Sequence, residues 1–110
     1  MNPEETNVRT SELFRRFQDE EACHQMMSML SLVSNQARFR ILCLLTVGEF
    51  CVNDIVRLVG GKSSNISQQL KILTLAGYVS KERVGKQIYY TLQDERVRSL
   101  VEFLHDLADR

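Results

Sequence analysis

The stretch from residue 62 to residue 92, KSSNISQQLKILTLAGYVSKERVGKQIYYTL, constrains the fold more than any other part of the chain. Ile66, Leu70 and Leu73 recur at helical spacing and predict one apolar stripe along a helix. Two β-rich runs follow this helix, and a short loop with Gly85 at its turn separates them. The segment therefore predicts a helix followed directly by a β-hairpin.

The outer face of the predicted helix is polar and carries no carboxylate. Amide and hydroxyl side chains can pair with the edges of bases, and lysine suits guanine or phosphate. A solvated helix usually includes Asp and Glu, so their absence favours an anionic partner, with a merely polar surface helix as the alternative. The candidate DNA-contacting residues of this helix are Ser63, Ser64, Asn65, Ser67, Gln68, Gln69 and Lys71.

The predicted hairpin has a basic tip. Gly77 suits a left-handed cap at the end of the helix, and the β-rich runs at 78–81 and 88–92 flank a loop at 82–87. Basic side chains at such a tip can clamp phosphates or enter a minor groove. The candidate DNA-contacting residues of the hairpin are Lys81, Arg83, Lys86 and Gln87.

Charge is unevenly distributed, although 14 basic and 14 acidic residues balance over the whole chain. Residues 57–90 hold six basic residues against Glu82 alone, a net charge of +5. Residues 1–25 carry a net charge of −3 and residues 91–110 a net charge of −2. The positive field is therefore local to the helix and hairpin, which favours focused binding over non-specific coating of nucleic acid.

Helical periodicity predicts the remaining elements. We expect a long helix over about 11–33 capped by Thr10 or Ser11, a second over about 36–46 opened by Asn35, a third over about 52–59 stopped by Gly60-Gly61, and a last over about 94–108. The predicted order is α-α-α-α-β-β-α, mainly α with a small β-hairpin, and the third and fourth helices form a helix-turn-helix. The first and last helices carry much apolar surface, which predicts a homodimer through them.

The length of 110 residues predicts one domain. With the elements above it is a winged helix-turn-helix domain over residues 10–110, after a flexible N-terminus at 1–9. No run of 18 apolar residues is present, so we expect no membrane span, and the polar, acidic N-terminus is unlike a signal peptide. Three widely spaced cysteines suit a reducing compartment better than a disulfide framework. We therefore expect a cytoplasmic protein.

Four motifs carry a family resemblance: SNQARFRILCLL (34–45), EFCVNDIV (49–56), SQQLKILTLAGYV (67–79) and GKQIYYTL (85–92). In this order they resemble the ArsR/SmtB family of winged-helix repressors over roughly residues 22–107. The resemblance implies a homodimer that sits on double-stranded operator DNA and leaves when an effector binds. The chain departs from the family at Gln69, where a histidine is frequent, and this departure bears on sequence preference.

The resemblance offers three kinds of effector site, of which the first is a thiolate metal site written ELCVCD at the start of the third helix. Cys51 matches, but Asn53 replaces the second cysteine. Soft metal ions need two or three thiolates to bind tightly. Cys23, contributed by the other subunit, is the candidate second ligand for a metal ion, and no metal site is assigned from the sequence.

The other two kinds of effector site are incomplete in this chain. A zinc or nickel site on the last helix would need a histidine at Arg96, two residues after Asp94, and His105 is out of register. A sulfur or redox switch pairs a cysteine in ILC with one near the chain's end, and Cys43 matches the first whereas Asp109 occupies the second position. A dithiol relay therefore cannot form in the family's way.

Cys43 and Cys51 also have purely structural interpretations. Cys43 lies in an apolar helix, where cysteine behaves as a small hydrophobe. Cys51 precedes the third helix, where it is a poor cap with Asp54 at the third helical position, yet a helix N-terminus also favours a thiolate. We therefore rank Cys51 first among the sensing candidates, with Cys23 or Cys43 assisting, and interpret His105 as a surface or interface residue.

These observations predict a sequence-specific, homodimeric repressor that a metal ion or a thiol-reactive effector releases from its operator. The alternative is a winged-helix protein-interaction module without effector-controlled operator binding. An enzyme is not expected, because His24 and His105 are the only histidines and no nucleophile–base–carboxylate set or phosphate loop is visible.

Overall fold

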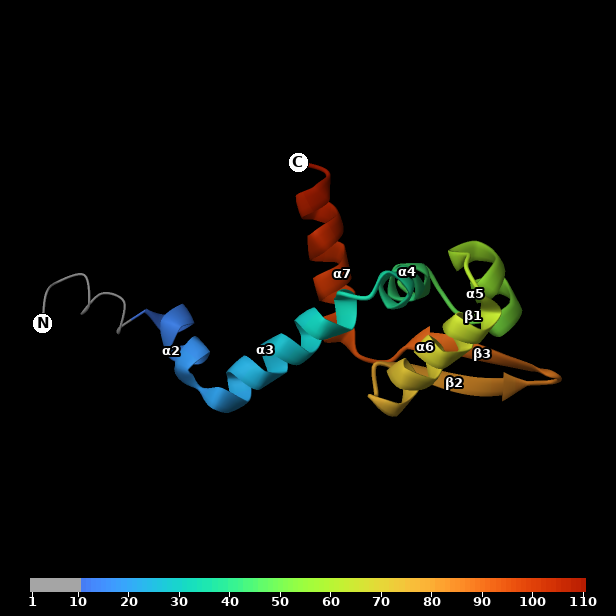
Figure 1. The fold of residues 1–110 in the computed structure, drawn as a ribbon, viewed down its shortest axis with the longest axis horizontal. Coiled ribbons are helices and arrows are strands. Elements are labelled where there is room, and N and C mark those ends of the chain that lie inside the picture. Colours follow the sequence, from blue (N-terminus) through green and yellow to red (C-terminus); the bar gives the residue numbers. More distant parts are fainter. Residues whose placement is uncertain (1–10) are drawn as a thin grey trace, which may run out of the picture. The chain divides into compact units, whose positions relative to one another are not determined.

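The computed structural model describes residues 11–110 of the chain (Figure 1). Its backbone contacts divide the chain into two compact units, one that ends at Leu32 and one from Val33 to Arg110. The predicted flexible segment 1–9 and the alternative cap Thr10 lie outside the described residues.

The long first helix predicted over 11–33 is wrong, because the structure has two helices there, α2 (Glu12–Gln18) and α3 (Glu20–Val33). The Ser11 hydroxyl caps α2 by accepting from the Phe14 N–H at 3.5 Å. The Asp19 backbone is extended, and its carboxylate accepts from the N–H groups of Glu21 at 3.0 Å and Ala22 at 3.2 Å. Asp19 therefore ends one helix and caps the next, which apolar periodicity alone does not reveal.

The other four predicted helices are confirmed within one or two residues, as α4 (Gln36–Leu45), α5 (Val52–Val59), α6 (Ser63–Leu75) and α7 (Glu95–Ala108). Asn35 caps α4 by accepting from the Arg38 N–H at 2.9 Å, and Asp94 caps α7 by accepting from the Arg96 N–H at 2.9 Å. Gly60, with φ of 84°, ends α5.

Gly77 terminates α6 with a φ of 83°. Its N–H donates to the Thr74 carbonyl at 3.1 Å, and the Tyr78 N–H donates to the Leu73 carbonyl at 3.1 Å. These two bonds form a Schellman motif, which requires the left-handed conformation that glycine adopts most easily. The motif turns the chain from α6 straight into the hairpin.

The hairpin strands are β2 (Val79–Val84) and β3 (Gln87–Leu92), and a short β1 (Phe50–Cys51) completes an antiparallel sheet of order β1-β3-β2. The predicted six-residue loop at 82–87 is wrong, because Val84 pairs with Gln87 and only Gly85 and Lys86 form the turn. Gly85 has a φ of 65°, as a two-residue hairpin turn that opens with glycine requires. The strand residues of this segment are charged and exposed, so their sequence resembles a loop.

The core of the second unit is built around α4, which contacts α5, α6, α7 and β3 (Figure 1). Arg98 also ties α7 to the end of α4, because its Nη1 donates to the Thr46 carbonyl at 2.7 Å. No helix in the described part of the chain is long and apolar enough to cross a membrane. The fully buried side chains are Ile41, Leu42, Leu45, Ile55, Ile66, Leu70, Leu73, Val79, Val97 and Val101.

The Schellman motif generates a stability prediction. Gly77→Ala should destabilise the fold by about 1–2 kcal/mol, because a Cβ is disfavoured at a positive φ. Thermal denaturation should then show a melting temperature lower by about 4–8 °C for each kcal/mol. Gly48→Ala is the matched control, since Gly48 has no positive φ and a Cβ there meets nothing within 4 Å. Equal melting temperatures for the two variants would contradict the assignment.

Candidate nucleic-acid interface and thiol site

The outer face of α6 presents Ser63, Ser64, Asn65, Ser67, Gln68 and Lys71, all exposed. The opposite face packs Ile66, Leu70 and Leu73 into the core. The exposed face therefore carries hydroxyls, amides and an amine, which can donate to or accept from base edges and phosphates.

The N-terminus of α6 lacks the caps that the helices α2, α4 and α7 have. Lys62 stands at the N-cap position without a side-chain hydrogen bond, and the first turn of α6 holds no acidic residue. The first N–H groups of a helix have no partner within the helix and carry partial positive charge. This end of α6 is consequently suited to an anionic group such as a phosphate.

Gln69, another candidate DNA contact from the sequence, does not lie on this outer face. It is only 7% exposed, and its Oε1 accepts from Arg38 Nη1 at 3.0 Å. Its Nε2 donates to Asn65 Oδ1 at 3.2 Å. The sequence held a signal for this burial, because Gln69 falls three residues after Ile66 and one before Leu70, within the apolar stripe. Arg38 was not among the residues predicted from the sequence, because its role depends on a contact 31 positions away.

The hairpin carries the four remaining candidates, Lys81, Arg83, Lys86 and Gln87, and all are exposed. Lys81 and Arg83 are two residues apart in β2 and therefore project from the same side of the strand. Arg83 Nε donates to the Gly85 carbonyl at 3.3 Å, which anchors the guanidinium beside the turn. The hairpin thus presents a basic edge.

Cys51, the first-ranked sensing candidate, is buried and 5% exposed. It occupies the N-cap position of α5 but makes no capping hydrogen bond. Its thiol instead donates to Asp54 Oδ2 at 3.3 Å, and the same carboxylate accepts from Arg57 Nη2 at 3.2 Å. The Cys51 thiol is therefore enclosed and already engaged with a carboxylate.

Cys43 lies in a different setting, on α4 facing α7. Its Sγ is 3.3 Å from His105 Nε2, and the His105 ring stacks on Phe39 with the ring centroids 6.3 Å apart. Burial raises the pKa of the half-buried Cys43 thiol, and a backbone hydrogen bond opposes this rise. His105 is exposed, in agreement with its interpretation as a surface or interface residue, but its contact with a thiol could not be predicted from the sequence.

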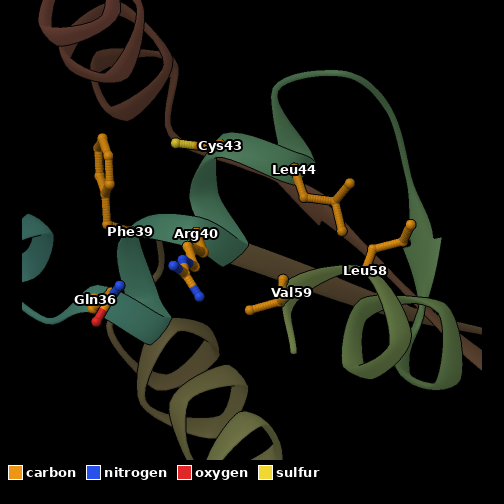
Figure 2. A pocket seen from close by; sticks show the side chains of 7 residues that line it. All are labelled: Gln36, Phe39, Arg40, Cys43, Leu44, Leu58 and Val59. Carbon is orange, nitrogen blue, oxygen red and sulfur yellow. The ribbon is translucent and has the colours of Figure 1, made fainter. Parts of the chain in front are cut away.

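A pocket of about 540 Å³ adjoins Cys43 (Figure 2). Figure 2 shows Phe39 and Cys43 on one side of α4 and Leu44 on the other, where Leu58 and Val59 of α5 face it, with Arg40 between. Cys43 therefore lines a partly apolar pocket together with the guanidinium-bearing Arg40.

Among residues 11–110, no group of three or more His, Cys, Asp or Glu side chains is placed to hold a metal ion. Asp94, which opens the family's zinc or nickel motif, caps α7 and pairs with Arg96 at 2.7 Å. Cys23 is half-buried on α3, within the first unit.

Known protein sequences are similar to this chain. A sequence model described as "Bacterial regulatory protein, arsR family" matches residues 35–81. The Biofilm growth-associated repressor of Xylella fastidiosa is 31% identical over 88 residues, which cover 80% of this chain and 77% of that protein.

Solved structures share the fold. The transcriptional repressor BigR from Xylella fastidiosa has a TM-score of 0.77 and 30% identity, covering 84% of this chain and 94% of that one. The homodimeric winged helix-turn-helix domain of Mb0332 from Mycobacterium bovis has a TM-score of 0.70 and 30% identity, covering 83% and 86%. These relatives are DNA-binding regulators, and the matched sequence model covers α5 and α6. The chain therefore belongs to the ArsR family of bacterial regulatory proteins.

Proposed function

We propose that this protein is a homodimeric transcriptional repressor that binds operator DNA in the bacterial cytoplasm and is released by a thiol-reactive effector. The observation that carries the DNA-binding part is the exposed, carboxylate-free face of α6 beside the basic edge of the β2–β3 hairpin. A helix of this kind fits the major groove, and a basic hairpin fits the flanking backbone.

The two elements have different roles in this proposal. Gln68 and Asn65 lie exposed on α6 and carry amides, which can discriminate between bases. Arg83 and Lys86 lie exposed on the hairpin, where a charge beside phosphate releases counterions without reading sequence. Specificity is therefore assigned to α6, and a large share of salt-dependent affinity to the hairpin.

Dimerisation is supported by apolar side chains that the described chain leaves exposed. On α7, Phe103 is 57% exposed and Leu107 is 44% exposed, and α3 exposes Met26, Met27 and Leu30. A surface of this kind is suited to a second copy, and the structural neighbour from Mycobacterium bovis is homodimeric. The competing interaction module would use the same side chains for another protein, without operator binding.

The effector site is assigned to Cys43 in preference to Cys51. Cys43 contacts a base, His105, and adjoins a cavity, whereas the Cys51 thiol is enclosed and donates to Asp54. A base within hydrogen-bond reach can accept the proton of a thiol as the thiol reacts, which gives Cys43 a route to react although burial raises its pKa. A metal ion held by Cys51 and by Cys23 of a partner subunit is the alternative effector.

The division of roles on DNA is tested by a pair of substitutions. Gln68→Ala should relax base preference, whereas Arg83→Ala should weaken binding to every sequence and reduce the slope of log K against log[salt] by about 1. Fluorescence anisotropy with a selected operator and with mixed fragments, over a salt series, measures both quantities. Equal loss of specificity in the two variants would refute the division.

Dimerisation through α7 is tested by replacing exposed apolar residues with acid. Phe103→Asp should shift the protein from dimer to monomer, because a charge replaces apolar surface at the proposed interface, and operator affinity should fall about tenfold or more as two half-sites are uncoupled. Light scattering and anisotropy measure the two effects. Val47→Asp is the control, since Val47 is 79% exposed and lies outside α3 and α7. A Phe103→Asp dimer with unchanged affinity would contradict this interface.

The thiol proposal is tested on protein that carries one cysteine at a time. Peroxide or polysulfide should release operator from the Cys43-only protein and not from the Cys51-only protein. Because the pKa of Cys43 is raised, its alkylation by iodoacetamide should be slow at neutral pH and should accelerate as pH rises past the ordinary thiol range. Release of the Cys51-only protein alone would return the site to the start of α5.

A further inference from the structure

Three polar side chains form a hydrogen-bonded chain from α4 to the outer face of α6. Arg38 on α4 donates through Nη1 to Gln69 Oε1 at 3.0 Å, and Gln69 Nε2 donates to Asn65 Oδ1 at 3.2 Å. Gln69 is buried, whereas Asn65 is exposed on the face assigned to DNA. These hydrogen bonds thus join α4, a core helix, to Asn65, a candidate base contact.

The guanidinium group of Arg38 sets the direction of every bond in this chain. Arginine has five N–H donors and no acceptor, so Gln69 must turn its carbonyl oxygen toward Arg38. The Gln69 amino group then faces Asn65 and needs an acceptor, which is Asn65 Oδ1. Reversing either amide would place two donors against each other in a part-buried contact, which polar groups away from solvent avoid.

The consequence falls on the exposed end of the chain. With Oδ1 engaged by Gln69, Asn65 turns its Nδ2 amino group away from Gln69, toward the solvent side of α6. A free asparagine pairs bidentately with adenine, accepting from N6 and donating to N7. Asn65 holds its Oδ1 inward against Gln69, so its amino donor is the group that it presents outward.

We propose that Gln69 is a specificity-determining residue that orients Asn65 as a donor-only reader of base edges. Resting on the proposed DNA-binding function, the assignment gives Asn65 the acceptor edges of the major groove, namely guanine N7 and O6, adenine N7 or thymine O4. The edges excluded are those that need an acceptor from protein, cytosine N4 and adenine N6. Asn65 is the third residue of α6, and recognition helices contact base edges with their N-terminal residues.

The decisive variant is Gln69→Glu, which keeps the length of the side chain and changes its hydrogen-bonding character. A carboxylate accepts from Arg38 and accepts again on its other oxygen, so Asn65 must turn its amino group inward. Asn65 then presents Oδ1 outward as an acceptor. Selection from a randomised DNA library should favour guanine or thymine at one position for the native protein, because these bases offer only acceptors in the major groove. The variant should favour cytosine, which offers only a donor, at that position, with about a tenfold change in relative affinity.

Two further proteins isolate the effect. In an Asn65→Ala background the Gln69→Glu substitution should leave that position unselected, because the reader is absent. Gln69→Met, which packs without polar atoms, should leave Asn65 free to rotate and should broaden the selection there. A change of preference that persists without Asn65 would overturn the assignment.

The outcomes separate this inference from the function on which it rests. If the native protein selects no sequence at all, the DNA-binding proposal fails. If it selects a sequence and folded Gln69→Glu selects the same one, the orientation of Asn65 by Gln69 is refuted and DNA binding stands. If Gln69→Glu does not fold, side-chain amide NMR of the native protein decides. The Gln69 amino protons should then be protected from solvent exchange and the Asn65 amino protons should shift on binding, and the reverse pattern would refute the proposal.

Discussion

Burial of α4 is the constraint on which the rest of the second unit depends. Ile41, Leu42 and Leu45 are almost completely excluded from solvent, and the helix contacts α5, α6, α7 and β3. Since protein interiors are close-packed, a displacement of α4 must be accommodated by several of these neighbours. The same helix carries Cys43, which contacts α7, and Arg38, which contacts Gln69 of α6. The proposed effector site and the proposed base-reading residues of α6 are therefore both attached to α4. Cys43 and Arg38 are joined by helix alone, so no loop lies between them that could take up a displacement of one residue relative to the other.

Much of this arrangement follows from sequence pattern. The apolar stripe of α6, the cap at Asn35 and the glycine stops fix four helices to within one or two residues, because spacing and capping are local properties. The break between α2 and α3 at Asp19 was not predicted, because apolar residues continue on both sides of it. The Asp19 carboxylate caps α3. The full length of the hairpin strands was not predicted, because the charged residues Glu82 and Arg83 are typical of a loop and only their pairing with β3 shows that they belong to a strand.

The candidate site shows the same limit more sharply. Exposure of Gln68 and Lys71 is a matter of helical phase, which the sequence contains. The contact of Gln69 with Arg38 and that of Cys43 with His105 join residues 31 and 62 positions apart, and only tertiary folding brings them together. The preference for Cys51 rested on its position at a helix start, and packing of the fold leaves that residue only 5% exposed. Chemistry that depends on one element was therefore predictable, and chemistry between elements was not.

The basic hairpin has a consequence for solubility. The sheet order β1-β3-β2 leaves β2 as an edge strand, with one row of backbone N–H and C=O groups unpaired by the sheet. Exposed edges invite strands of other molecules to add on and aggregate, and charged side chains discourage this addition. Lys81, Glu82 and Arg83 stand on this edge. The cationic side chains proposed to hold phosphate thus also discourage association of protein copies when no DNA is bound. A variant with less charge on β2 would need another feature to protect this edge strand.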